Sequence, residues 1–515
     1  MSQVQAQTFR RTCLRFAAVL AFLTTVLSPA MLTAQCTSTT QADVVALDQV
    51  YFWNRLGAVE PQGMVFALLR DIVPINTTIG IAPGNVQLRS DKRPRPLVLR
   101  VNAGSCLQIN FRNLLNSAKP DKDAPSTRTA SVHATGMQLV GSIASDGSNV
   151  GANTSSLVAP GGTATYTFFA EHEGGYLMYS AAATTGGEGN GGSISAGLFG
   201  AIMVEPAGAE YYRSQVTADD LFYATTGTTT DGHPIINYAA VYPATDPRTG
   251  LALPAIKAGH PVLKMIESGK IIYSDLNAII TGPSAGRFAA GTYVSTPVNP
   301  DRLQPFREFS VIFHDEVGAF QAFHEFRDTL SVKTFQSVKD GFAINYGTGG
   351  IGAEILANRF GVGPMWQCTE CKYEEFFLSA WAVGDPAMVV DVPANVSDAL
   401  GNVIPGPKAS KAFYPDDPSN VHHSYIGDHV KFRNIHAGPK EHHIFHLHAH
   451  QWVNTPDSDN STYLDSQAIG PGAAFTYEIT YNGSGNRNKT VGDAIFHCHF
   501  YPHFAQGMWE LWRSH

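Results

Sequence analysis

The stretch HCHFYPHFAQGM, residues 497–508, places a cysteine between two histidines and follows it with His503 and Met508. Side chains in a β-strand point alternately to opposite faces, so His497 and His499 share one face and Cys498 lies on the other. A thiolate, imidazoles and a weak thioether are the donors of a copper electron-transfer site. The stretch therefore predicts copper chemistry near the C-terminal end of the chain.

The second imidazole that such a site needs is available in EHHIFHLHAHQW, residues 441–452. His443 comes first, and the alternation that follows places His446 and His448 on one face, where they can meet His497 and His499 across a common cavity. A lone histidine is more often structural, but this combination of donor types and spacings agrees with a known coordination geometry. The neighbouring histidines that match no ligand slot are expected to be solvated or to lie behind the ligands: His422, His423, His429, His436, His442 and His450.

Together the two segments resemble the last domain of the multicopper oxidases, which carries His-x-x-His-x-His and then His-Cys-His-x3-His-x4-Met. The resemblance implies a type 1 copper held by His443, Cys498, His503 and Met508. It assigns a second set of ligands to the trinuclear cluster of type 2 and type 3 copper, where oxygen is reduced: His446, His448, His497 and His499. It also implies an all-β fold of three cupredoxin-like Greek-key β-sandwich domains with few short helices.

An altered copy of the C-terminal pattern occurs early in the chain. GGYLMYSA (174–181) aligns with GDAIFHCH (492–499), so that Tyr179, Ser180 and Ala181 stand where the His-Cys-His triplet stands. The first domain is therefore predicted to be a second β-sandwich of the same kind without a type 1 copper. Multicopper oxidases also bring two His-x-His pairs from this domain to the trinuclear cluster, and here only His133 is present, with Ser131 in its partner's place. The cluster is expected to be incomplete.

Length and strand-like patterns predict four segments: a signal peptide (1–34), a first cupredoxin-like domain (35–206), an inter-domain segment with a second such domain (207–395) and a third domain carrying the type 1 copper (396–515). The apolar stretch REFSVIFHDE, residues 307–316, is assigned to a buried strand of the middle sandwich.

The first residues have the composition of an export signal. Arg10, Arg11 and Arg15 precede an apolar run, residues 16–27, that is too short to span a bilayer. We expect an exported protein, periplasmic or extracellular, without a membrane span; both the general secretory and the twin-arginine routes remain open. The net charge of −8 and the absence of a basic run give no case for nucleic-acid binding.

Removal of the signal leaves five cysteines, so one thiol stays unpaired in an exported chain. Cys498, between its histidines, is the natural candidate, and Cys36 with Cys106 is a possible disulfide. Cys368 and Cys371 could form a local disulfide, a redox pair or half of a zinc site, and a structural role is favoured.

The function that we expect is an exported, multicopper-oxidase-like copper oxidoreductase. A small-molecule or metal-ion reductant would donate electrons to the type 1 copper, Cys498 would pass them to His497 and His499, and oxygen would be the implied acceptor. The alternative is a copper-binding electron-transfer protein that no longer reduces oxygen. A third interpretation, copper storage, is favoured least.

Overall fold

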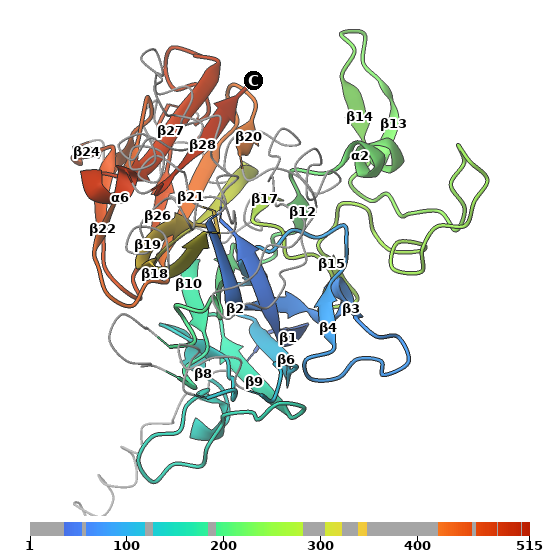
Figure 1. Cartoon of the computed structure of the whole chain (residues 1–515). Coiled ribbons are helices and arrows are strands. Elements are labelled where there is room, and N and C mark those ends of the chain that lie inside the picture. The colour runs from blue at the N-terminus through green and yellow to red at the C-terminus, as the bar shows by residue number, and fades with distance from the viewer. Residues whose placement is uncertain are drawn as a thin grey trace, which may run out of the picture. The chain divides into compact units, whose positions relative to one another are not determined.

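Strands make up nearly all of the regular structure in the computed structural model (Figure 1). The structure describes residues 36–53, 58–118, 127–183, 192–281, 304–321, 338–347, 421–455, 460–481, 483–505 and 507–515. From Thr37 onward these residues belong to one unit. The helices of the described residues are short: η1 (Leu69–Asp71), η2 (Ile143–Ser145), α2 (Ala218–Ala224) and α6 (Tyr501–Ala505). The all-β fold with few short helices is confirmed.

The first sandwich combines two sheets, each with a parallel pair of strands. In one sheet β1 runs parallel to β6 and β6 antiparallel to β9; in the other β5 runs parallel to β11, which is antiparallel to β10, and β10 pairs with β7. The strands of this part of the chain are β1 (Thr39–Phe52), β2 (Ala58–Leu68), β3 (Ile72–Pro74), β4 (Val86–Leu88), β5 (Leu97–Asn102), β6 (Cys106–Asn113), β7 (His133–Ala134), β8 (Gln138–Leu139), β9 (Thr163–Phe169), β10 (Gly174–Tyr179) and β11 (Phe199–Glu205).

The local sequence explains the strand β6. Leu107, Ile109 and Phe111 alternate with half-buried polar residues and enter the core, as the sequence pattern predicts. Residues 97–115, LVLRVNAGSCLQINFRNLL, have the sequence pattern of one half-buried strand. The structure instead has a turn at Gly104, whose φ of 84° favours glycine, and two strands in different sheets.

The last sandwich repeats this topology. β18 runs parallel to β21, which is antiparallel to β26, while β20 runs parallel to β28, β28 antiparallel to β27, and β27 antiparallel to β22. Its strands are β18 (Phe306–Gln321), β19 (Val338–Ile344), β20 (His422–Ser424), β21 (Val430–His436), β22 (His443–Leu447), β23 (Trp452–Val453), β24 (Tyr463–Leu464), β25 (Ser466–Ile469), β26 (Ala474–Glu478), β27 (Gly492–Cys498) and β28 (Trp509–Ser514).

One strand assignment from the sequence is corrected. Residues 307–316, predicted for a middle sandwich, lie in β18, and Arg307–Phe313 pair residue for residue with Val430–His436 of the copper-ligand sandwich. The partners are more than a hundred positions apart in the sequence, and strand patterns do not reveal which distant strands pair. Among the described residues the sandwich topology occurs in two copies, in the first and last parts of the chain.

The described residues between the two sandwiches form small strands and the short helix α2. The strands are β12 (Tyr211–Arg213), β13 (Thr225–Thr228), β14 (Pro234–Ile236), β15 (Ile266–Glu267), β16 (Lys270–Ile271) and β17 (Asn277–Ile280). Two of them extend the sandwich sheets, because β16 pairs with β1 and β17 pairs with β18.

The two sandwiches share a core. Val98 and Phe199 of the first pack in one cluster with Ile312 and Ile435 of the last. A buried charge cluster lies at the same junction, where the guanidinium of Arg100 donates to Glu308 at 3.0 Å and that of Arg433 donates to the other oxygen of Glu308 at 2.9 Å. Both arginines are about 2% exposed and Glu308 is fully buried, so these ion pairs are shielded from water.

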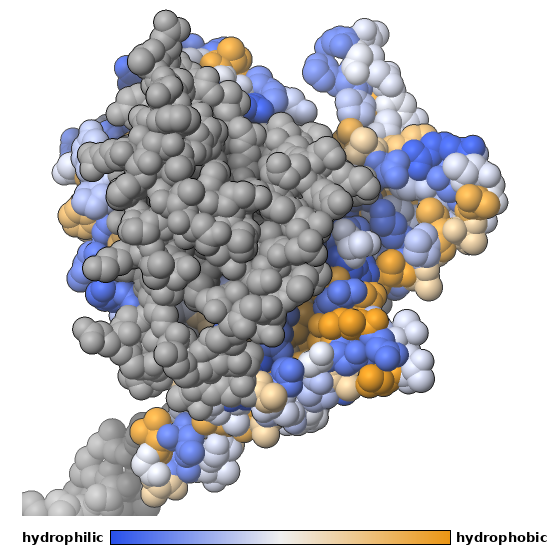
Figure 2. All heavy atoms as spheres, viewed as in Figure 1, coloured by the Kyte–Doolittle hydropathy of each residue, from blue (hydrophilic) through white to orange (hydrophobic). Residues whose placement is uncertain are grey.

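On the part of the surface that is coloured in Figure 2, hydrophilic and hydrophobic residues are interspersed. No helix among the described residues is long and apolar enough to cross a membrane. Cys36 and Cys106 are disulfide-bonded, and Cys498 is a free, buried thiol. The predicted signal peptide, Cys368 and Cys371 lie outside the described residues.

Candidate metal centre

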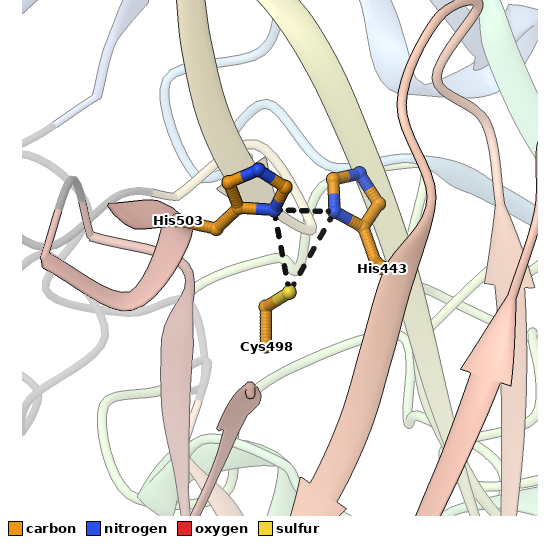
Figure 3. Close-up of side chains that lie close together, drawn as sticks. All are labelled: His443, Cys498 and His503. Carbon is orange, nitrogen blue, oxygen red and sulfur yellow. Dashed lines mark hydrogen bonds between the residues drawn. The ribbon is translucent and has the colours of Figure 1, made fainter. Parts of the chain in front are cut away.

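A cysteine and two histidines converge in the core of the last sandwich (Figure 3). β22 supplies His443, the end of β27 supplies Cys498, and the short helix α6 supplies His503. Cys498 Sγ lies 3.7 Å from His443 Nδ1 and 3.4 Å from His503 Nδ1, and the two nitrogens are 3.0 Å apart. Cys498 pairs with Phe445 across the strands, so His443, two residues before Phe445, is on the face that carries the thiol.

Met508 lies where the chain returns from α6 to β28. It is fully buried in the same core cluster as Cys498, and its carbonyl accepts the Cys498 N–H at 3.1 Å. The thiol of Cys498 and the imidazoles of His443 and His503 converge as ligands of one ion would, and Met508 lies in the same buried cluster. Donors about 2.0 to 2.3 Å from a common ion at trigonal angles lie roughly 3.5 to 4 Å apart, close to the observed separations, and the donor types are those of blue-copper sites.

Burial controls the protonation of these donors. It raises the pKa of the Cys498 thiol to about 11, although the amide of Ile444, 3.4 Å from Sγ, opposes the shift. Burial, together with the neighbouring imidazole of His503, lowers the pKa of His443 to about 3. At neutral pH the site thus holds a protonated thiol and a neutral His443, and a metal ion would have to displace the thiol proton.

A second group of imidazoles lies on the opposite face of the β22–β27 pair. His446 is register partner to His497, and His448 Nε2 lies 3.2 Å from His497 Nε2. Ligand atoms of His446, His448 and His497 all lie within 4.8 Å of one another, which suits one metal ion. The exposed ring of His499 is 4.9 Å from that of His446. The alternation predicted from the sequence therefore separates the two groups as expected.

His133 is not part of that group. Its ring lies 5.3 Å from that of Tyr179, its strand neighbour, and its Nδ1 is 2.8 Å from the carbonyl oxygen of Asp146. The groups of converging metal-binding atoms within the described ranges include no residue of the first sandwich. That the trinuclear cluster is incomplete stays a prediction from the sequence.

The first sandwich reproduces the frame of the copper site without its donors. Tyr179 pairs with His133 as His497 pairs with His446. In the next position the hydroxyl of Ser180 accepts the amide of Ser131 at 3.1 Å, the contact that Cys498 Sγ makes with the amide of Ile444. The sequence alignment of these two stretches matches the strand register.

Sequence patterns missed two carboxylates, and they left open whether His436 is solvated or lies behind the ligands; the structure has it behind His443. Asp315 of β18 lies with its Oδ2 3.4 Å from His443 Nε2, and Glu441 has Oε2 3.2 Å from His503 Nε2. The ring of His436 stacks on that of His443, with centroids 4.5 Å apart, and is fully buried rather than solvated. The sequence HDE at 314–316 contains potential partners of metal ligands. Only the pairing of β18 with β21 shows that it lies near the ligands.

The comparisons with known proteins bear on the first sandwich. Residues 86–209 match the family model described as "Multicopper oxidase". The matched residues run from β4 to just past β11 of the first sandwich. The match lies in the part of the chain where the ligand motifs are weakest, so it supports the resemblance independently of the C-terminal segments. The donor set in the last sandwich and this family agree on copper redox chemistry.

Solved structures with a similar course of the chain are copper proteins at low similarity. A multicopper oxidase has 13% identity and a TM-score of 0.38, with 93% of this chain and 89% of that chain covered. A copper nitrite reductase from Nitrosomonas europaea has 13% identity and a TM-score of 0.40, with 93% and 94% covered. A blue copper oxidase from the same organism has 12% identity and a TM-score of 0.39, with 93% and 86% covered. Scores this low do not establish function, and the comparison with curated proteins finds no match.

Proposed function

We propose that the chain is an exported copper oxidoreductase whose type 1 site is held by His443, Cys498, His503 and Met508. The observation that carries the proposal is the convergence of the Cys498 thiol with two imidazole nitrogens within 3.0 to 3.7 Å in a buried core. Copper bound there would supply a one-electron redox couple.

The protein surface suggests where a reductant approaches. The side chain of His503 is 8% exposed and the adjacent Glu441 is 37% exposed, whereas His443 is fully buried. A small-molecule or metal-ion reductant therefore comes nearest to the site at the edge of His503. On the other side, the backbone of Cys498 leads directly to His497 and His499, whose side chains lie on the opposite face of the sheet.

Oxygen is the acceptor that this proposal implies, with His446, His448 and His497 as ligands of a second copper. Three imidazoles leave part of a metal's coordination shell to water or another donor. His133 lies beside Tyr179 instead of this group, and this observation favours the second candidate function, a copper electron-transfer protein that does not reduce oxygen.

Copper analysis, an absorption spectrum and oxygen uptake test the proposal on the purified chain. An intense blue thiolate band with about one copper per chain at the type 1 site is the expected result. Sustained oxygen uptake with a phenolic or manganous reductant supports the oxidase, while reduction of the blue centre without turnover supports the electron-transfer protein. A copper-loaded sample without the blue band refutes both.

A further inference from the structure

The remote nitrogens of both proposed copper-binding imidazoles face carboxylates. His443 and His503 turn Nδ1 toward Cys498 Sγ, so a metal bound through Nδ1 requires the proton of each ring on Nε2. His503 Nε2 is hydrogen-bonded to Glu441 Oε2 at 3.2 Å. His443 Nε2 is buried and has no hydrogen-bond partner among the described residues, and Asp315 Oδ2 lies 3.4 Å from it. The two carboxylates differ in environment, because Asp315 is about 1% exposed and Glu441 about 37% exposed.

Several contacts hold the Asp315 carboxylate under the ring of His443. Its Oδ2 accepts the amide of Glu441 at 2.9 Å. Gly438 passes so close that a Cβ there would come within 2.4 Å of Asp315 Oδ1. The chain between β21 and β22 therefore wraps tightly around this one carboxylate, which leaves it little freedom to move away.

His436 lies close enough to Asp315 and His443 for these three residues to be considered as a metal site of their own. Ligand atoms of Asp315, His436 and His443 lie within 4.8 Å of one another, a separation that could hold a metal. Both nitrogens of His436 are already committed, since Nε2 donates to the carbonyl of Glu441 at 2.6 Å and Nδ1 accepts the amide of Gly438 at 3.0 Å. His436 thus supports the ring of His443 by stacking and leaves the role of acceptor to Asp315.

We propose that Asp315 is a positioning residue of the type 1 site: when copper is bound at Nδ1, it accepts the Nε2 proton of His443, fixes the Nδ1-binding tautomer and lowers the copper reduction potential. A ligand histidine that donates its second nitrogen to a carboxylate is held in orientation and becomes a stronger donor. A nearby negative charge also stabilises the more highly charged cupric state over the cuprous state. The inference rests on the proposed type 1 copper.

The test is the reduction potential of the copper-loaded full chain carrying Asp315→Asn. The amide keeps the shape and an acceptor oxygen but removes the charge, so the blue band should remain. We expect the cupric-to-cuprous equilibrium to shift about tenfold toward the cuprous form, a rise of about 59 mV for one electron. The potential is read by titrating the blue band, which a purely structural role would not move.

Glu478→Gln is the matched control. Glu478 is about 8% exposed and its Oε1 lies 2.8 Å from Nε2 of His429, so the variant also alters a buried carboxylate–histidine pair of the last sandwich, away from the ligands. Its potential should equal that of the wild type. An Asp315→Asn protein that is blue and has the potential of this control overturns the inference.

A measurement on the wild type covers the case in which Asp315→Asn does not fold. In the diamagnetic cuprous protein, nuclear magnetic resonance should show a downfield, hydrogen-bonded proton on Nε2 of His443. An Nε2 proton at the position of a free imidazole overturns the inference. A wild-type protein without a blue band instead refutes the proposed type 1 site, so the two failures are distinguishable.

Discussion

Cys498→Ser should abolish the blue colour and leave the fold intact. A hydroxyl does not supply the thiolate that gives rise to the band. The cost to stability can be worked out from the contact at Sγ. Burying a hydroxyl in place of the fully buried thiol costs about 1 to 3 kcal/mol, and the amide of Ile444 offsets about 0.5 to 1.5 kcal/mol by donating to it. The net destabilisation is roughly 1 kcal/mol.

The first sandwich shows that a serine is tolerated in this position, because Ser180 accepts the amide of Ser131 at 3.1 Å. Copper-loaded samples are assayed by absorption, and copper-free samples by urea unfolding. The control is Cys498→Ser combined with Ser180→Cys, which moves a thiol to a position that belongs to none of the converging metal-binding groups among the described residues and should be colourless. A blue Cys498→Ser protein would show that the ligand is misassigned, and a variant that does not fold would contradict the estimate of its cost.

Three further predictions concern other parts of the molecule. Glu308→Gln should lower the free energy of unfolding by roughly 3 kcal/mol or more, because it weakens the pairing of buried Arg100 and Arg433; denaturant unfolding measures this, and a loss below 1 kcal/mol would argue against a stabilising role. Burial lowers the pKa of His422 from 6.5 to about 3, so the unfolded chain alone takes up this proton and stability falls as the pH drops below about 6.5, by about 1.4 kcal/mol per unit from this group. His422→Gln should flatten that slope in urea unfolding of the copper-free protein, and an unchanged slope would refute the assignment. His446→Ala should remove the second copper and keep the blue band, which copper counting and absorption check; loss of the band instead would mean that the two sites are not separate.

The sequence was sufficient to predict the geometry of the site wherever residues close together along the chain determine it. Strand alternation places Cys498 and His497 on opposite faces, and the structure has the thiol buried and the imidazole half-buried. The alignment of Tyr179 with His497 likewise follows from local pattern, and the register of β10 and β27 agrees with it. Close spacing to Cys498 also predicted His503 as one of the two imidazoles, and its Nδ1 lies 3.4 Å from Cys498 Sγ.

The sequence did not reveal which strands far apart along the chain pair with each other. Asp315 comes to His443 because β18 runs parallel to β21, and no pattern in either strand specifies the other as its partner. The same pairing places residues 307–316 in the last sandwich, whereas apolar composition alone placed them in a middle one. The described residues carry two copies of the sandwich topology, and the division of the whole chain into three domains stays a prediction.

Comparison of the two sandwiches distinguishes the features that come from the shared strand topology from those that come from the side chains. Both present a buried position whose side chain accepts an amide from the facing strand, occupied by Ser180 in one copy and Cys498 in the other. Both place an imidazole beside the preceding residue of that strand, since His133 neighbours Tyr179 and His446 neighbours His497. The strand topology alone is therefore insufficient for copper, because the first copy has the frame and lacks the thiol. The proposed oxidase has a second copper, and the proposed electron-transfer protein has only the type 1 copper. The two proposals then differ only in whether three imidazoles on one face of β22 and β27 hold a metal without donors from the first sandwich.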